Sequence, residues 1–508
     1  MEARIFNNFR NYSIQAIPTG TWLLHKTIGS ALWLFVLMPS CLSSTIYAQA
    51  VTLSPVVEMQ SSLQNWGIEP LFHLDLGLRG AASCAASSCH GGPRPAVSTP
   101  TAARGSEYSL WLEKDPHAQS WRTLSSDASQ RILTKLGIVK QGAIVNQPAY
   151  ENCLACHNTS RNLSDDRLTP QLAEGVGCEL CHGPAQPWYD RHYQPREQLV
   201  TGMTDIRPLV QRAKLCTTCH VGSSDRDMNH DIIAAGHPAL YFDMAVYHDR
   251  YPKHWRESGE SDSDFRARLW LAGQIAMTDA ELELLEARSK KSLSVSIWPE
   301  LSLYRCTDCH VALNGLPQLP RDADRELVTT GRASPREWNW SGIDSLTKYL
   351  SRDAATPLSD ELEKIKRLLQ DKPPDASKVL PVAQSLRRLL AAQFNLPADR
   401  NLQNWNLQNW DHLRLRNLSR EQLSSPKVAV EWEAAAKFYI AAWSSSSQFQ
   451  SKEMFEAMRT MRYALVFPQD KQSPRFPRQK DSPSPPNLEE WRNALRQAAV
   501  GLLESNSP

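Results

Sequence analysis

Four short motifs hold the residues of this chain whose types and spacing indicate chemistry. Each has the form Cys-x-x-Cys-His, and they begin at Cys153, Cys178, Cys216 and Cys306. This pattern is the attachment signature of c-type haem, in which each thiol forms a thioether bond with a haem vinyl group. The histidine that follows is the proximal ligand of the iron.

A fifth motif is stretched, because four residues separate Cys84 from Cys89 before His90. The intervening Ala and Ser side chains are small enough to let the loop bulge over a haem ring, so we predict a fifth haem here. The alternative is that Cys84 does not take part in haem attachment. The predicted attachment cysteines are Cys84, Cys89, Cys153, Cys156, Cys178, Cys181, Cys216, Cys219, Cys306 and Cys309. The predicted proximal ligands are His90, His157, His182, His220 and His310.

Zinc and disulfides are the alternative uses of these cysteines. The pairs Cys153-x-x-Cys156 and Cys178-x-x-Cys181 are spaced nearly as in a zinc ribbon. A ribbon does not need a histidine directly after each second cysteine, yet all four regular motifs have one. Disulfides within Cys-x-x-Cys would close only tiny loops and make a poor framework. The repeated pattern therefore favours haem c.

Residues 1–50 have the pattern of a secretory signal peptide. Basic residues precede a short apolar run at 28–38, and Ala48-Gln49-Ala50 is a small-x-small cleavage site. The run is too short for a comfortable transmembrane helix, and an uncleaved N-terminal anchor is the alternative. We expect cleavage near Ala50 and a periplasmic or otherwise extracytoplasmic protein.

Charge and cysteine content narrow the function classes. The chain has 56 Lys and Arg against 54 Asp and Glu, and cleavage after Ala50 would make the balance neutral. A basic footprint is absent, so we expect no nucleic-acid partner, DNA included. Cleavage would also remove Cys41, so that every remaining cysteine lies in a motif. The expected partners are redox proteins, among them a membrane-bound complex.

Spare histidines are numerous enough to supply a second axial ligand to each iron. Neutral imidazole is a good iron ligand. An iron with two histidines mainly passes electrons, whereas an open iron binds exogenous molecules. The histidines that we choose as second ligands are His117, His192, His230, His237 and His254. We expect His230 and His237 to serve different haems from one helical face, and His412, far from the motifs, to be structural.

The expected fold is mainly α, with little strand and a haem-packed core followed by a helical C-terminal region. The short spacings between motifs leave little room for a conventional core. A helix is expected from about 264 to 290, where Leu269, Ala272 and Ala276 recur on one face. Later helices are expected at 358–369, 382–394, 432–442 and 487–503, the last after a Pro- and Ser-rich linker at 470–487. The predicted domains are the signal peptide 1–50, the multihaem region 51–315 and the helical region 316–508.

Several segments around the motifs resemble the multihaem cytochrome c-554 family, which is related to hydroxylamine oxidoreductase and the pentahaem nitrite reductases. The resemblance covers about residues 80–315. It is carried by Cys84 to Gly92, Asp115-Pro-His117-Ala118, Glu174-Gly-Val-Gly-Cys178-Glu-Leu-Cys-His182-Gly-Pro, Asn229-His-Asp-Ile-Ile-Ala-Ala-Gly-His237-Pro, Pro252-Lys-His254-Trp255 and Trp298-Pro-Glu.

The resemblance implies closely packed haems that are mostly ligated by two histidines. It also implies the distal ligands, which are His117, His192, His230, His237 and His254. The chain departs from the family at Val311, where relatives often have a second histidine after the last motif. It has five motifs instead of the eight of hydroxylamine oxidoreductase, and no Cys-x-x-Cys-Lys motif.

The leading functional prediction is an extracytoplasmic electron carrier with about five covalently bound haems. The alternative is a haem oxidoreductase that acts on hydroxylamine, nitrite or a similar small oxyanion at one open haem. A third interpretation is an assembly subunit whose region 316–508 docks a membrane partner.

Overall fold

The computed structural model describes the parts of the chain that hold most of the motif residues. The described residues are 77–93, 105–160, 174–193, 202–255, 260, 264–293, 297–306, 333–350, 357–394, 410–423, 432–445, 455–456 and 458–459. The predictions that lie outside these ranges are the signal peptide, Cys309, His310, Val311, the linker 470–487 and the helix at 487–503.

The described residues are mainly helical, as predicted. The motif region contains η2 (Ala81–Cys84), α2 (Glu107–Lys114), η3 (Pro116–Ser125), α3 (Asp127–Lys135), α4 (Gln147–His157), α6 (Cys178–His182), α7 (Leu209–His220), α8 (His230–Ala235) and α9 (Met244–Arg250). Strand is confined in these ranges to β1 (Val139–Lys140) and β2 (Ala143–Ile144), an antiparallel pair in which Val139 faces Ile144.

Helix ends present the three regular motifs that are fully described. Helices α4, α6 and α7 each finish on the motif histidine, which is His157, His182 or His220. Residues three apart share a helix face, so the helical turn brings the two thiols of a motif to one side. The helix end then leaves the histidine at the edge of that side.

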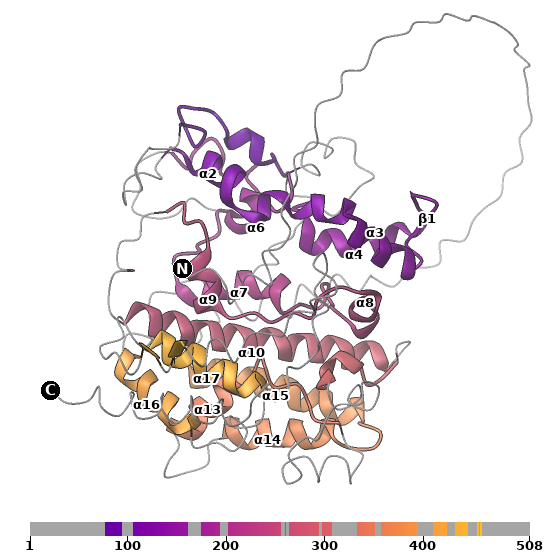
Figure 1. Cartoon of the computed structure of the whole chain (residues 1–508), viewed down its shortest axis with the longest axis vertical. Helices are drawn as coiled ribbons and strands as arrows, with labels where there is room; N and C mark the ends of the chain where they lie inside the picture. The colour runs from indigo at the N-terminus through magenta and orange to yellow at the C-terminus, as the bar shows by residue number, and fades with distance from the viewer. Residues whose placement is uncertain are drawn as a thin grey trace, which may run out of the picture. The chain divides into compact units, whose positions relative to one another are not determined.

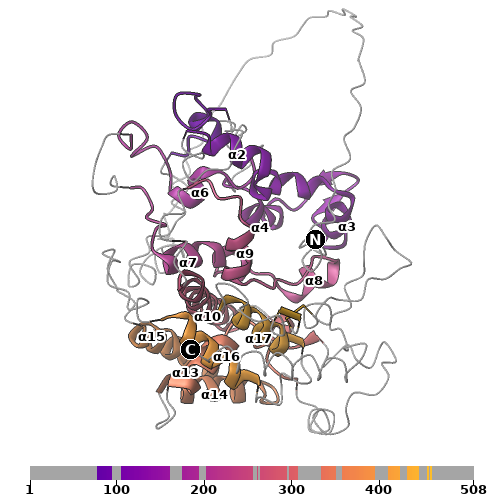
Figure 2. The same cartoon turned by 60° about the vertical axis from the view of Figure 1, so that its left-hand side comes forward.

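Helix α10 (Phe265–Ser292) confirms the helix predicted at 264–290. It packs against α7 and α9 of the motif region and also against α15, and both views place it between them (Figures 1 and 2). The prediction of one apolar face was too narrow, because residues such as Ala267, Trp270 and Leu271 are buried as well. Neighbours on both sides bury most of the helix surface.

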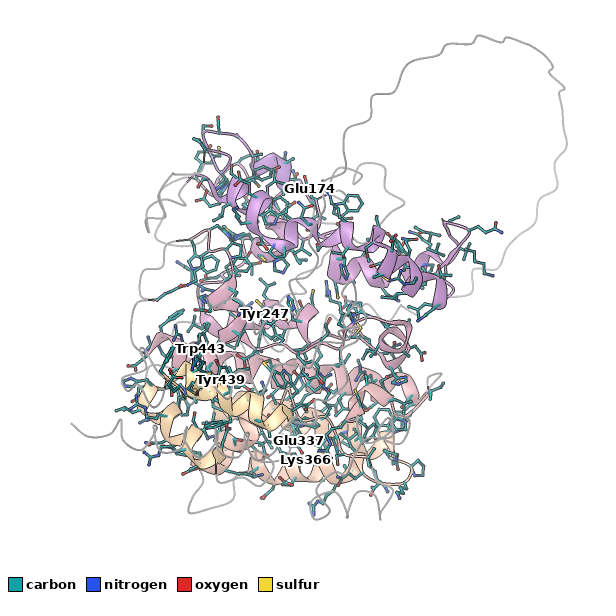
Figure 3. All side chains as sticks on the ribbon, in the orientation of Figure 1. Glu174, Tyr247, Glu337, Lys366, Tyr439 and Trp443 are labelled. Carbon is teal, nitrogen blue, oxygen red and sulfur yellow. The ribbon has the colours of Figure 1, made fainter. Side chains whose placement is uncertain are left out.

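The elements after α10 are η5 (Leu301–Leu303), α13 (Ser341–Leu350), α14 (Pro357–Leu369), α15 (Ala376–Gln393), α16 (His412–Leu423) and α17 (Trp432–Ser444). In α14 the predicted apolar positions, among them Leu362 and Ile365, are buried. Helix α15 begins six residues before the predicted start at 382, because Asp375 caps it by accepting from the Ser377 amide. Figure 3 shows this helical layer, with Lys366 and Tyr439 labelled.

Conventional apolar packing beside the motifs is sparse. The buried clusters there are small, for example Ala81 with Trp111 and Ala118, or Leu133 with Ile138 and Val139. Larger packing is found around α10, where Gly273 lets α9 approach so closely that a Cβ on it would lie 2.5 Å from the Cβ of Met244. The domain boundary at 315 stays a prediction. Among the described helices, none has the length and apolarity needed to cross a bilayer.

Candidate haem sites

Four motif histidines each face a different histidine that the sequence predicts as a second ligand. The sequence predicts which histidines are ligands but leaves their pairing open, and the structure brings the following rings close together. We define site 1 as His90 with His192, site 2 as His157 with His237, site 3 as His182 with His254, and site 4 as His220 with His117. Their ring centroids are 6.1, 6.4, 6.4 and 6.1 Å apart, respectively.

These separations fit a metal ion held between two imidazoles. A metal–nitrogen bond of about 2 Å plus about 1 Å from nitrogen to ring centre, taken twice, gives about 6 Å. Aromatic pairs in direct contact span a similar range, so the distance alone is not specific. Specificity comes from the repetition, since each of the four motif histidines has its own separate partner.

The hydrogen bonds of the rings fit metal binding as well. A metal-bound histidine usually donates its second ring N–H to a carboxylate or a carbonyl, which fixes the tautomer and leaves the other nitrogen for the metal. Five of these histidines have such an oxygen 2.8–3.0 Å from Nδ1. The pairs are His90 with Glu107, His117 with Asp115, His157 with the Ser120 carbonyl, His192 with the Tyr189 carbonyl, and His237 with the Pro238 carbonyl.

Burial keeps two proximal histidines in the neutral form that binds metals. It lowers the pKa of His182 to about 4, with a further contribution from the nearby His254. Burial likewise lowers the pKa of His220 to about 3, helped by His117. For His117 itself, burial is the largest influence and lowers the pKa, but the hydrogen bond with Asp115 and the charge of Asp115 together outweigh burial, and the net shift is upward.

Two carboxylates fasten the stretched motif, which is the first in chain order, to the third motif in chain order, Cys178–His182. Glu179, which is buried inside the third motif, accepts from the backbone N–H groups of Arg79, Gly80 and Ala185 at 2.7–3.1 Å. Glu174, labelled in Figure 3, accepts from the amides of Ala81 and Ala82. The start of site 1 is thereby held against site 3.

The attachment cysteines show which sites are neighbours. Cys84 hydrogen-bonds to Cys178, so the motifs of sites 1 and 3 touch. Cys219 hydrogen-bonds to Cys156, which joins sites 4 and 2. The ring of Tyr251 lies 5.9 Å from His117 of site 4 and 6.0 Å from His254 of site 3, so these two sites adjoin. The spatial order is therefore 1, 3, 4, 2.

Residues 83–183 match the family model of cytochrome c554 and c-prime. This part of the chain is similar to the cytochrome c554 family. The match confirms the predicted resemblance and spans the first three motifs, from Cys84 to His182, with the stretched motif among them. The protein is therefore a c-type cytochrome, and its haem is covalently bound. No curated protein and no solved structure matches the chain.

Helix η3 of this cytochrome serves two sites at once. It carries His117 of site 4, and its Ser120 hydroxyl donates to the backbone carbonyls of both His117 and His157 at 2.8 Å. The Ser120 carbonyl and the Thr123 hydroxyl also lie 3.0 Å from His157 Nδ1. One short element thus orients the distal ligand of site 4 and the proximal ligand of site 2.

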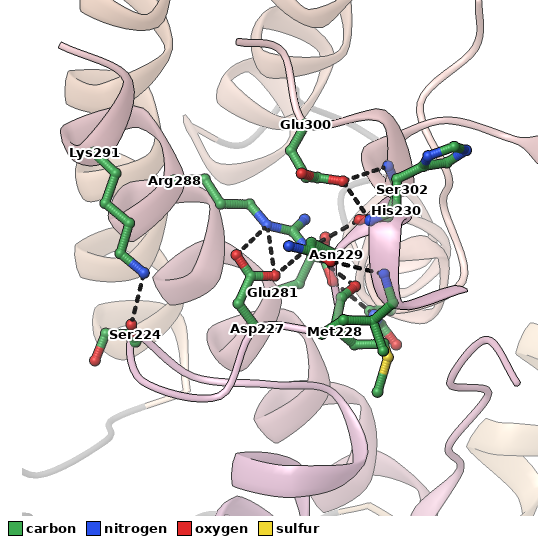
Figure 4. Close-up of polar contacts among 12 residues, drawn as sticks. Ser224, Asp227, Met228, Asn229, His230, Glu281, Arg288, Lys291, Glu300 and Ser302 are labelled. Atoms are coloured by element: carbon green, nitrogen blue, oxygen red, sulfur yellow. Dashed lines mark hydrogen bonds and ion pairs between the residues drawn. The ribbon is translucent and has the colours of Figure 1, made fainter. Parts of the chain in front are cut away.

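His230 lies at the start of α8, beside the segment that leads into the last motif. Its backbone N–H donates to Glu300 at 2.7 Å, and Glu300 also caps η5 just before Cys306. Arg288 joins the same two segments through Asp227 and Ser302 (Figure 4). The prediction that His230 and His237 share one helical face was wrong, because α8 ends at Ala235 and Gly236 follows with φ +124°.

Two further histidines have structural roles. His412 Nδ1 lies 2.6 Å from Asp264 Oδ1, at the N-terminal end of α10, which confirms the structural role predicted for it. His248 is buried, and its Nε2 lies 2.9 Å from Nη1 of Arg212. The arginine can only donate, so this nitrogen of His248 is an acceptor.

Sequence reasoning missed the residues that hold the ligands. Glu107 and Asp115 bind the Nδ1 atoms of His90 and His117, and Tyr251 hydrogen-bonds to Asp115. Asp115 lies two residues before His117, so the sequence Asp-Pro-His could have predicted this hydrogen bond. Glu107 and Tyr251 are brought to their partners only by the fold.

Proposed function

We propose that this cytochrome is an extracytoplasmic electron carrier with five haems c, whose irons are each held by two histidines. The observation that carries the proposal is that four motif histidines each face a separate histidine. Five of these eight histidines also have an oxygen at hydrogen-bond distance from Nδ1. Bound haem supplies a one-electron iron couple. Two histidines on the iron leave no open position, which suits electron transfer better than bond chemistry.

The fifth site in this proposal pairs His310 with His230. The other four predicted distal ligands already face four other motifs. The hydrogen bond from His230 N–H to Glu300 also ties α8 to the segment that leads into Cys306. Both observations support His230 as the second ligand of the last motif.

The chain's own residues have three tasks in this function. They orient five of the eight imidazoles through an oxygen beside Nδ1, lower the pKa of five of the eight by burial, and hold neighbouring motifs in contact. The order of sites 1, 3, 4 and 2, inferred from the contacts between neighbouring sites, supports a continuous series of centres. The location outside the cytoplasm rests on the N-terminal signal pattern, and the proposed partners are redox proteins, such as a membrane-bound complex.

A haem assay combined with electron paramagnetic resonance (EPR) tests the proposal. We expect five haems per chain and only low-spin ferric signals, unchanged when nitrite or hydroxylamine is added. Four haems per chain would remove the stretched motif from the proposal. A high-spin signal that shifts with nitrite or hydroxylamine would instead favour the oxidoreductase that acts at an open haem.

A further inference from the structure

Asp115 makes an unusual set of contacts for a carboxylate next to a proposed iron ligand. Its side chain is 1% exposed. One oxygen, Oδ1, lies 2.9 Å from Nδ1 of His117 and also accepts from the His117 backbone N–H. The other oxygen, Oδ2, accepts a hydrogen bond from the hydroxyl of Tyr251. A buried carboxylate thus stands between a ligand imidazole and a phenol.

We propose that Asp115 and Tyr251 set the reduction potential of the iron at site 4, and that they act in opposite directions. The proposal rests on the proposed function, in which His117 and His220 hold that iron. Asp115 and Tyr251 are positioning residues, since each acts through His117 and neither contacts the iron.

The carboxylate lowers the potential because it pulls on the Nδ1 proton of His117. The ring then becomes more basic at the other nitrogen, and a more basic ligand stabilises ferric over ferrous iron. Burial strengthens this effect, because hydrogen bonds and charges act more strongly where water is excluded. Asp115 should therefore favour the oxidised state.

Tyr251 opposes this effect because its O–H donates to the same carboxylate. A donor on Oδ2 draws negative charge away from Oδ1 and weakens the pull on the His117 proton. The phenol ring also stacks on Trp255, with the ring centroids 5.5 Å apart. Its ring centroid also lies 5.9 Å from His117 and 6.0 Å from His254. Tyr251 therefore stands between the distal ligands of sites 4 and 3.

The other sites have weaker acceptors. His157, His192 and His237 have neutral backbone carbonyls beside Nδ1. His90 has a carboxylate, but the Glu107 side chain is 23% exposed and water screens it. Among the described ligand histidines, only His117 is hydrogen-bonded to a carboxylate that is almost fully buried. The tuning should therefore be strongest at site 4.

The test compares Asp115→Asn, Tyr251→Phe and the double variant by redox titration of the intact haem-loaded protein. We expect one component of the titration to move upward in Asp115→Asn, by about a tenfold change in its one-electron equilibrium, or about 59 mV. The same component should move downward in Tyr251→Phe. The double variant should follow Asp115→Asn, since the phenol acts only through the carboxylate.

Two further variants make the result decisive. His117→Ala should turn one haem high-spin in EPR and so identify the component of the titration that belongs to site 4. If no haem becomes high-spin, the assignment of two histidines to this iron fails, and this outcome is distinct from a failure of the tuning by Asp115 and Tyr251. Tyr247→Phe is the matched control, because that ring packs on His220 of the same site at 5.0 Å without a hydrogen bond to Asp115. We expect it to leave the potential unchanged.

Tuning by Asp115 and Tyr251 is overturned if the two single variants shift the component in the same direction, or if either leaves it in place. Tyr251→Phe removes one hydroxyl and keeps the hydrogen bond that Asp115 accepts from the His117 backbone N–H. Its downward shift therefore tests the proposal even if Asp115→Asn fails to mature. A haem count on each variant confirms full loading.

Discussion

At the residue scale, the histidines of the four sites differ mainly in what lies beside Nδ1. The acceptor is a carboxylate for His90 and His117 and a backbone carbonyl for His157, His192 and His237. In site 3, Nδ1 of His254 is buried and has no hydrogen-bond partner among the described residues. Chemically identical ligands can therefore give irons of different potential.

Replacement of a single distal histidine should leave one coordination position of a single iron vacant. In His192→Ala we expect one of the haems to become high-spin, because site 1 then has only His90. EPR of the purified variant measures this. The matched control is His412→Ala, whose ring pairs with Asp264 and faces none of the described motif histidines; its spectrum should remain entirely low-spin. A fully low-spin His192→Ala would contradict the pairing at site 1.

At the element scale, short segments are fixed by carboxylates because apolar packing beside the motifs is thin. Glu260 accepts from Trp255 at 2.8 Å and pairs with Lys253 at 3.1 Å, so it holds both neighbours of His254. It also accepts from Arg212 of α7, the helix that carries the fourth motif. One side chain thus links the distal ligand of site 3 to the attachment helix of site 4.

Glu179→Ala should loosen the stretched motif selectively. The change leaves the N–H groups of Arg79, Gly80 and Ala185 without their acceptor, and each buried unsatisfied donor costs about 1–3 kcal/mol. We expect less haem on the peptide that contains Cys84 than on the other motif peptides, as measured by peptide mass spectrometry. Glu151→Ala, which removes a contact with the Gln147 side chain, is the control. Equal haem occupancy in all motifs would refute this role of Glu179.

At the scale of the whole molecule, α10 is the element that contacts both the motif region, through α7 and α9, and the later helices, through α15. Asp279 near its middle pairs with Arg387 of α15 at 2.9 Å and with Lys214 of α7 at 3.0 Å. Burial raises the pKa of Asp279, but the two cations outweigh burial and lower it to about 2. The carboxylate therefore stabilises the fold wherever it stays ionised.

Asp279→Asn should destabilise the protein at neutral pH and matter less in acid. A folded pKa of about 2 against 3.8 in the unfolded chain corresponds to about 2 kcal/mol, present above about pH 4 and lost as the pH falls through 2. Urea unfolding at pH 7 and pH 3, followed by circular dichroism, measures the difference from the unmodified chain.

The control for Asp279→Asn is Asp205→Asn, which breaks an exposed pair with Arg207. The arginine side chain is 65% exposed, and exposed pairs contribute little. We expect a smaller destabilisation at pH 7 than for Asp279→Asn. A destabilisation by Asp279→Asn that stays the same at both pH values would contradict the assigned ionisation.

Much of this arrangement was predictable from the sequence because covalent attachment requires a fixed local pattern. The motifs, the helical class and the main helices, such as α10 and α14, follow from spacing and periodicity. The pairing of ligands did not follow, since His90 meets His192 only through contacts distant in sequence. Burial around α10 was underestimated because a one-face pattern cannot show that helices cover both sides. The break at Gly236 was missed because a seven-residue spacing resembles two helical turns.

The ligand pairs of the four sites interlace along the chain. His90, His117, His157 and His182 come first in sequence, and their partners His192, His220, His237 and His254 follow in the same order. The first histidine of every site therefore precedes, in the sequence, the second histidine of any site. A chain that stopped shortly after His220 would contain four attachment motifs but both ligands for only sites 1 and 4. In the proposed function, therefore, the chain cannot be divided into single-haem modules that each contain both ligands of their iron.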